Sequence, residues 1–159
     1  MKKILALVLS LMMMFSLVSA SAEGFEEYFP GTWVKFEDGF EVYLPSDWLQ
    51  LEVTEDDLAS GIFYSFCSPD ATKLGQIAWA GLEAEVTLEE LQSAFPGSEM
   101  TEAIEGVRLL VAADKANDTL TFIGLDAAEP GYYAFLFAPA SDPELLAYAS
   151  VIASSIRNF

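Results

Sequence analysis

Acidic side chains are the most abundant titratable groups in this sequence. The chain has 25 Asp and Glu residues against 7 Lys and Arg residues, and it has no histidine. Without an imidazole, neither a Ser–His–Asp triad nor a Cys–His pair can form, and no histidine can ligate a metal. The groups most available for chemistry are therefore carboxylates, hydroxyls and aromatic rings.

The first acidic cluster follows Trp48 and comprises Glu52, Glu55, Asp56 and Asp57. Four neighbouring carboxylates predict a site for a cation or for a basic partner. The same residues also suit the solvated start of a short helix, because the helix dipole favours acids in the first turn. The Asp-x-Asp-x-Asp-Gly spacing of a calcium loop is absent, which favours the helix interpretation.

The second cluster lies between two predicted strands and comprises Asp114, Asn117 and Asp118. Its oxygens make it a candidate metal site for a hard cation. It also suits a turn, since Asn and Asp side chains bond to their own backbone and accept left-handed geometry. We favour the turn.

Aromatic residues are a further source of binding chemistry. An exposed row of rings would stack on sugars or hold an apolar peptide, whereas a buried row would simply form the core of a β-sheet. Tyr43 shares a strand face with the charged Glu41, so we expect it to be the most exposed aromatic side chain and a candidate binding residue. The rings considered are Trp33, Tyr43, Trp48, Phe63, Tyr64, Phe66, Trp79, Tyr132, Tyr133, Phe135 and Phe137.

The charge balance excludes several functions. Nucleic-acid binding needs Lys and Arg to neutralise phosphates, and an anionic membrane surface would repel so acidic a chain. No glycine-rich phosphate loop follows a strand, and no cofactor is expected. A carboxylate-based hydrolase stays open as a minor alternative. It would need two acids about 5–10 Å apart in a cleft, one with a raised pKa.

Residues 1–22 are typical of a secretory signal peptide. Lys2 and Lys3 precede an apolar run, and the small residues 20–22 predict cleavage before Glu23, with cleavage after Ala20 as a close competitor. The alternative is an uncleaved membrane anchor, since the segment is just long enough to span a bilayer. Cleavage predicts a secreted, extracellular or periplasmic protein that has no membrane attachment.

The predicted mature chain, residues 23–159, is long enough for one domain with its own core. Losing Lys2 and Lys3 leaves 25 acids against 5 bases, so the net charge falls from −18 to −20. Cys67 is alone and lies in an apolar run, which indicates a small buried side chain rather than a disulfide or a catalytic thiol.

Alternating apolar residues between turn dipeptides predict a series of strands. The sharpest signal is Asp38-Gly39, which predicts a hairpin with a two-residue link. The apolar run 132–138 suggests a central strand covered on both faces. The other expected strands are 33–37, 40–44, 62–67, 75–82, 107–113 and 119–125, with a short edge strand within 98–104.

Two helices are expected. Thr87 and Glu90 form a capping box at the start of a helix over 87–95. The second helix should begin at Asp142 or Pro143 and run to about Ile156, with Arg157 placed to interact with its dipole. A short helix over 54–59 is also possible. Strands joined by short links, with helices to cover them, predict an α+β fold with a mostly antiparallel sheet flanked by helices.

Two stretches resemble a known family. Phe40-Glu41-Val42-Tyr43-Leu44-Pro45-Ser46-Asp47-Trp48 resembles the strand–Pro–turn–Trp motif of PsbP-like domains, and residues 148–156 resemble their closing helix. Stand-alone bacterial members include periplasmic DcrB-type proteins and small exported proteins of unknown role. The resemblance implies an α/β/α sandwich and structural roles for Pro45 and Trp48. It carries over no catalytic set, because PsbP-like domains are mostly accessory or binding modules.

Together these features favour an exported, non-catalytic binding or accessory protein. It would recruit a protein or an envelope component, with cationic partners favoured by the charge. A carrier of a small molecule or cation, with a pocket between sheet and helix, is the main alternative.

Overall fold

The computed structural model describes residues 24–37, 39–102 and 107–158, so the predicted signal peptide lies outside the described residues. Most of the chain is strand, with short helices between the strands. In chain order the elements are η1 Phe25–Glu27, β1 Gly31–Lys35, β2 Phe40–Pro45, β3 Leu49–Leu51, α2 Glu55–Ala59, β4 Ile62–Cys67, β5 Leu74–Gly81, α3 Leu88–Gln92, β6 Glu99–Glu102, β7 Arg108–Asp114, β8 Thr119–Leu125, β9 Gly131–Ala138, α4 Pro143–Ser154 and β10 Arg157–Asn158.

The strands form two antiparallel sheets. The large sheet has seven strands in the order β3-β4-β5-β9-β8-β7-β6, and the small sheet has three in the order β1-β2-β10. The predicted central strand is β9, which lies in the middle of the large sheet, and the predicted edge strand is β6. One face of β9 is fully buried and the other is half-buried, so the predicted cover is complete on one face and partial on the other.

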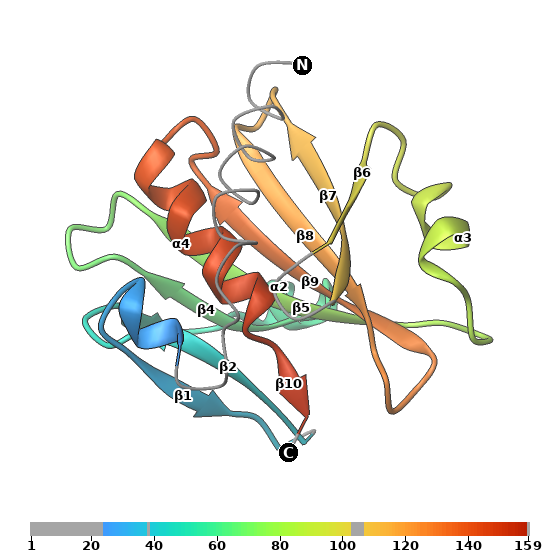
Figure 1. Cartoon of the computed structure of the whole chain (residues 1–159), viewed down its shortest axis with the longest axis horizontal. Helices are drawn as coiled ribbons and strands as arrows, with labels where there is room; N and C mark the ends of the chain where they lie inside the picture. Colours follow the sequence, from blue (N-terminus) through green and yellow to red (C-terminus); the bar gives the residue numbers. More distant parts are fainter. Residues whose placement is uncertain (1–23, 38, 103–106, 159) are drawn as a thin grey trace.

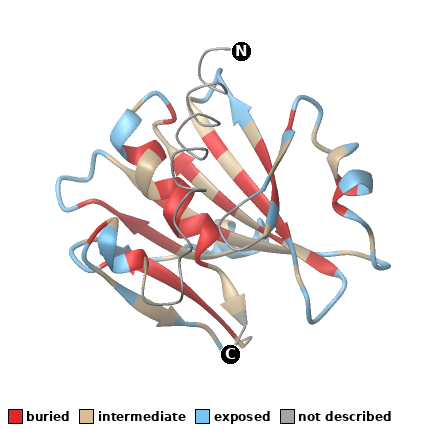
Figure 2. Cartoon of the chain, in the orientation of Figure 1, coloured by how far each residue is buried: buried red, intermediate tan, exposed pale blue. Residues whose placement is uncertain are grey.

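Helix α4 lies between the two sheets and contacts both β2 and β9 (Figure 1). Asp142 caps it, accepting from the backbone amides of Glu144 and Leu145, and Pro143 occupies its first turn. Most of its residues are buried, as Figure 2 shows, because each sheet covers one side of the helix. The main core therefore extends from the small sheet through α4 to one face of the large sheet.

A second, smaller apolar cluster lies on the opposite face of the large sheet. There α3 packs Leu88 and Leu91 against Leu110 and Ile123. Helices thus flank the large sheet on both faces, which confirms the predicted α+β sandwich. The predicted capping box is also present, because Thr87 accepts from the amide of Glu90 and the Glu90 side chain accepts from that of Thr87.

The predicted hairpin is formed by β1 and β2. Phe36 donates its amide to the carbonyl of Phe40, so the backbone pairing closes at these two residues. Asp38, in the predicted two-residue link, lies outside the described residues. Gly39 has a φ of 84°, a left-handed conformation that glycine adopts without steric cost.

The expected exposure of Tyr43 was wrong. Its side chain is only 1% exposed, because the segment that contains Phe25 and Phe29 folds over the outer face of β2. Its hydroxyl donates to the carbonyl of Phe29 at 3.2 Å. Strand β2 is thus buried on both faces, and Tyr43 is a core residue.

Arg157 does not act at the end of α4 as predicted, because the helix ends at Ser154 and the chain continues into β10. Its Nε donates to Oε1 of Glu41 at 2.7 Å, and its guanidinium carbon lies 3.6 Å from the ring centre of Trp33. Glu41 is buried although charged. The ion pair therefore anchors β10 to the small sheet.

Three further sequence predictions concern the short helix after Thr54, the thiol of Cys67 and the segment 98–104. A short helix follows Thr54, and Cys67 is a free, buried thiol, both as predicted. The described part of 98–104 forms β6. Among the described residues, no helix is long and apolar enough to cross a membrane.

Candidate binding sites

The half-buried face of the large sheet is the first candidate, and we call it the open face. Because side chains alternate along a strand and paired residues point the same way, the register assigns its members. From β3 through β8 they are Leu49, Leu51, Ser65, Cys67, Leu74, Gln76, Ala78, Ala80, Tyr132, Ala134, Leu136, Ala138, Thr119, Thr121, Ile123 and Leu125.

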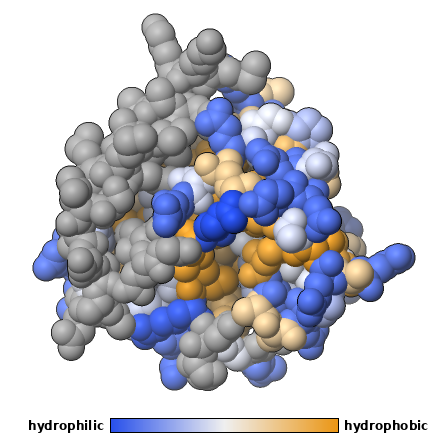
Figure 3. All heavy atoms as spheres, turned by 45° about the vertical axis from the view of Figure 1, so that its right-hand side comes forward, coloured by the Kyte–Doolittle hydropathy of each residue, from blue (hydrophilic) through white to orange (hydrophobic). Residues whose placement is uncertain are grey.

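None of these residues carries a charge, although acids outnumber bases 25 to 7 in the chain. The charged residues of the same face, Arg108 and Asp114 on β7 and Glu102 on β6, lie beyond β8 toward the far edge of the sheet. Helix α3 covers the end of this face near Leu110 and Ile123. Farther from α3, Leu49 and Leu51 are 54% and 37% exposed, which is unusual for leucine in a strand. A solvated sheet face ordinarily carries polar and charged residues. On the face that Figure 3 displays, apolar side chains gather in patches near the centre, with strongly hydrophilic side chains directly beside and around them.

The first acidic cluster lies beside β3, at one edge of the large sheet. Glu52, Glu55 and Asp56 are exposed, and Asp57 is partly exposed. Asp57 completes a capping box with Thr54, whose hydroxyl and amide donate to its carboxylate. The hydrogen bond from the Thr54 hydroxyl, followed by that from its amide, lowers the pKa of Asp57. The cluster thus serves a helix start, and its role in binding stays a prediction.

The second cluster lies in the β7–β8 turn. The carboxylate of Asp114 accepts from the amides of Ala116 and Asn117 and from the Asn117 side chain, which together lower its pKa. Asp118, with a φ of 53°, turns away and accepts from the amide and hydroxyl of Ser141. The two carboxylates therefore bond different partners. Neither they nor the other described residues form a group of three potential metal ligands.

A cavity of about 390 Å³ is the second candidate, and we call it the aromatic cavity. It lies where β4 and β9 begin and β5 ends, next to Leu58 of α2 and to the β8–β9 loop. Its lining residues are Leu58, Gly61, Ile62, Phe63, Trp79, Asp126, Ala128, Glu129 and Tyr133.

Two glycines make room for the indole of Trp79. Gly81 and Gly131 are paired across β5 and β9. A methyl group on Gly131 would lie 2.8 Å from the indole, and one on Gly81 would lie 3.0 Å from it. The indole therefore lies directly over the backbone of this strand pair.

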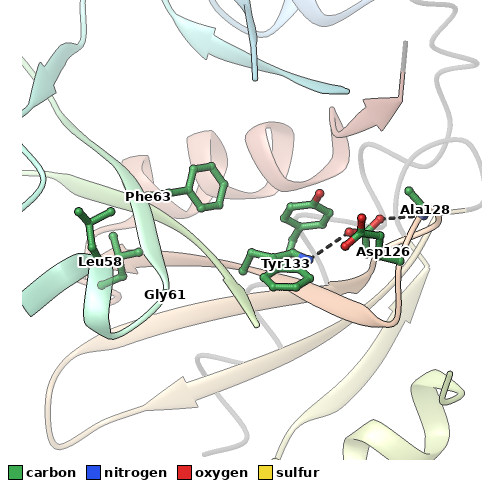
Figure 4. A pocket seen from close by; sticks show the side chains of 9 residues that line it. Leu58, Gly61, Phe63, Asp126, Ala128 and Tyr133 are labelled. Carbon is green, nitrogen blue, oxygen red and sulfur yellow. Dashed lines mark hydrogen bonds between the residues drawn. The ribbon is translucent and has the colours of Figure 1, made fainter. Parts of the chain in front are cut away.

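Asp126 is held beside this indole by two hydrogen bonds. Trp79 Nε1 donates to its Oδ2 at 3.0 Å, and the amide of Ala128 donates to its Oδ1 at 2.8 Å. Its own amide donates to the carbonyl of Gly131 and closes the loop. The carboxylate is thus fixed at the mouth of the cavity (Figure 4).

A β-bulge supplies the opposite wall. The register of β4 and β5 shifts between Ile62 and Tyr64, so Phe63 is the extra residue. Bulges redirect side chains, and Phe63 points toward Tyr133 across the cavity (Figure 4). Tyr133 stands opposite Trp79 in the strand register. Three rings therefore line a space that also holds two carboxyl groups.

Sequence reasoning did not identify the aromatic cavity. Trp79 and Asp126 are 47 residues apart, and neither lies in a recognisable motif. The available signals were weak: a glycine at the end of β5, another at the start of β9, and an Asp in the loop that precedes β9. The rings of Phe63, Trp79 and Tyr133 were among the aromatic candidates, but no pattern showed that they converge.

The two stretches that resemble PsbP-like domains contact each other. The ring of Trp48 lies 5.3 Å from that of Tyr148, and Ser155 Oγ accepts from the amide of Tyr43 at 2.9 Å. Both stretches thus contribute to one structural unit, and Trp48 is packed between Tyr148 and Phe66.

Comparison with solved structures identifies the fold. The chain is similar to cyanobacterial PsbP (CyanoP) from Synechocystis sp. PCC 6803, with a TM-score of 0.56 and 16% identity over 90% of this chain and 99% of that one. The chain has a PsbP-like fold. A Bacteroides thetaiotaomicron protein is also similar, with a TM-score of 0.55 and 13% identity over 83% of this chain, which spans 49% of that protein. No family model and no curated protein sequence matches the chain.

Proposed function

We propose that this chain is an exported, non-catalytic accessory protein that recruits a protein partner through its open face. The carrying observation is the absence of charged side chains from the open face on the five adjacent strands β3, β4, β5, β9 and β8, in a strongly acidic chain. The cores of protein interfaces are depleted in charge, whereas free surfaces are not.

The charges around the open face indicate which kind of partner it would bind. Acids border the open face, with Glu52 to Asp57 beside β3 and Asp114 at the end of the outer row on β7. A partner with an uncharged centre and a basic rim would complement this pattern, and the ionic part of the attraction would weaken with salt. An exported protein or a proteinaceous envelope component of that kind is the proposed occupant.

The test uses a pair of matched variants. Thr121 lies on the open face, between Ala112 and Leu136, whereas Thr32 is an exposed strand residue of the small sheet. Thr121→Arg and Thr32→Arg change the net charge equally. Purified protein serves as bait in an envelope extract of the producing cell, with an unrelated acidic protein as control.

We expect a partner that wild type and Thr32→Arg retain and that Thr121→Arg loses, with both variants showing wild-type circular dichroism. Capture that Thr121→Arg leaves unchanged would refute the role of the open face. A wild-type dimer that Thr121→Arg converts to monomer would assign the face to self-association and overturn the recruiting role.

The aromatic cavity favours the carrier as a second candidate function, because it lies between the sheet and α2 as that hypothesis requires. Hydrolysis has weaker support. Asp126 and Glu129 both line the cavity, but most of the other lining residues are apolar or aromatic and suit a bound carbon skeleton better than a hydrolytic site.

A further inference from the structure

We propose that the aromatic cavity binds a small organic cation, namely an ammonium group carried on a compact apolar body. This inference goes beyond the recruiting role and uses a different surface. It depends on the convergence of three rings and two carboxylates in one cavity.

Three aromatic rings line the cavity. Phe63, Trp79 and Tyr133 come from three different strands, and the bulge and the glycine pair described above direct two of them into the cavity. The face of an aromatic ring carries partial negative charge and attracts ammonium groups, which makes several converging rings a recognised receptor for them. A neutral apolar ligand would use the same rings but would gain nothing from the nearby charges.

The charged residues in the cavity lining are both acidic. Asp126 and Glu129 line the cavity, and no Lys or Arg is among the described residues that do so. An anion would be repelled. Each oxygen of Asp126 already accepts one hydrogen bond from the protein, so the group is fixed in position and still has lone pairs for a ligand.

The size and chemistry of the lining distinguish an organic cation from a metal ion. A cavity of about 390 Å³ lies in the range that holds a small molecule. Calcium would need about six to eight oxygen ligands. Here most lining residues are apolar or aromatic, so they suit the carbon body of an organic cation better than a bare ion.

Choline and its neutral carbon isostere, 3,3-dimethylbutan-1-ol, form the matched pair of probes. They have nearly the same shape and differ in charge. Binding is measured by titration calorimetry and by tryptophan fluorescence on the purified protein. N-acetyl-lysine amide, tested in parallel, shows whether the ammonium group can come from a peptide side chain rather than from a free small molecule.

Two variants test the cavity, each with a control. Asp126→Asn removes the charge but keeps an oxygen for Trp79, and Asp47→Asn removes the same charge at an exposed site elsewhere. Ala128→Lys adds a cation at the cavity. Its control is Ala116→Lys, because both alanines are exposed and both donate their amide to an Asp two residues earlier.

We expect choline to bind about tenfold more tightly than the isostere, and Asp126→Asn and Ala128→Lys each to weaken it about fivefold or more, with the controls within about twofold. Binding of N-acetyl-lysine amide alone would also support the proposal and identify a peptide source. The proposal fails if neither ammonium compound binds at millimolar concentration, if the isostere binds as tightly, or if Asp126→Asn behaves like Asp47→Asn. Thermal melts confirm that each variant is folded.

Discussion

Arg157→Ala should destabilise the protein substantially, because it leaves Glu41 buried without its closest partner. The Glu41 side chain is 7% exposed, and the remaining cation, Lys35, lies 3.8 Å away with 62% of its own side chain exposed. Breaking a buried pair costs about 3–5 kcal/mol, whereas an exposed pair contributes about 0–1 kcal/mol. Since the Arg157 side chain is 39% exposed, we take an intermediate loss of about 2 kcal/mol.

The contact with Trp33 adds to this loss. A guanidinium over an indole contributes about 0.5–1 kcal/mol at a partly exposed site. The total expected for Arg157→Ala is therefore about 2.5–3 kcal/mol in the free energy of unfolding. Arg157→Lys keeps the charge but lacks the planar group that stacks on the indole, so it should lose about 1 kcal/mol.

Urea denaturation of wild type, Arg157→Ala, Glu41→Gln and the double variant measures both the loss and its origin. Because the cost arises from an unpaired buried charge, the double variant should be more stable than the sum of the two single losses predicts, by about 1–2 kcal/mol. An Arg157→Ala loss below about 0.5 kcal/mol, or strictly additive losses, would show that the pair is not what holds β10 in place.

Two further predictions concern the turn after β4 and the β5–β9 strand pair. Hydrogen bonds from Ser68 and then Thr72 lower the pKa of Asp70 from 3.8 to about 2. The stabilising effect of the Asp70 carboxylate is therefore complete above pH 3.8 and disappears as the pH falls toward 2. The difference in urea midpoint between wild type and Asp70→Asn should therefore shrink over that interval, and a constant difference would contradict it. Gly131→Ala would place a methyl group 2.8 Å from the Trp79 indole. We therefore expect the free energy of unfolding to fall by about 1–3 kcal/mol and the tryptophan fluorescence to change. Wild-type stability together with wild-type fluorescence would contradict this packing.

Local signals in the sequence were sufficient for much of the fold. Asp142 and Pro143 located the start of α4, and Thr87 with Glu90 located α3, because capping groups act within a few residues of their own helix. The strands followed from alternation and turn dipeptides. The antiparallel pairing followed from the short links between them.

The errors came from contacts made over long sequence distances. Alternation assigned Tyr43 to an outer face, and it could not show that the segment with Phe25 and Phe29 covers that face. Arg157 looked like the end of a helix because its partner, Glu41, lies 116 residues earlier. The aromatic cavity was missed for the same reason, since a bulge at Phe63 leaves no mark in the hydrophobic pattern.

The pairing of β10 with β2 also affects how the chain reaches this structure. Strand β2 has β1 on one side, supplied by the same hairpin, but the strand on its other side is synthesised 116 residues later, counted from Glu41 to Arg157. At about 5–20 residues per second, that edge stays unpaired for roughly 6–23 s of translation. An open strand edge can pair with other chains. The N-terminal hairpin therefore exposes an unpaired strand edge until β10 has been synthesised.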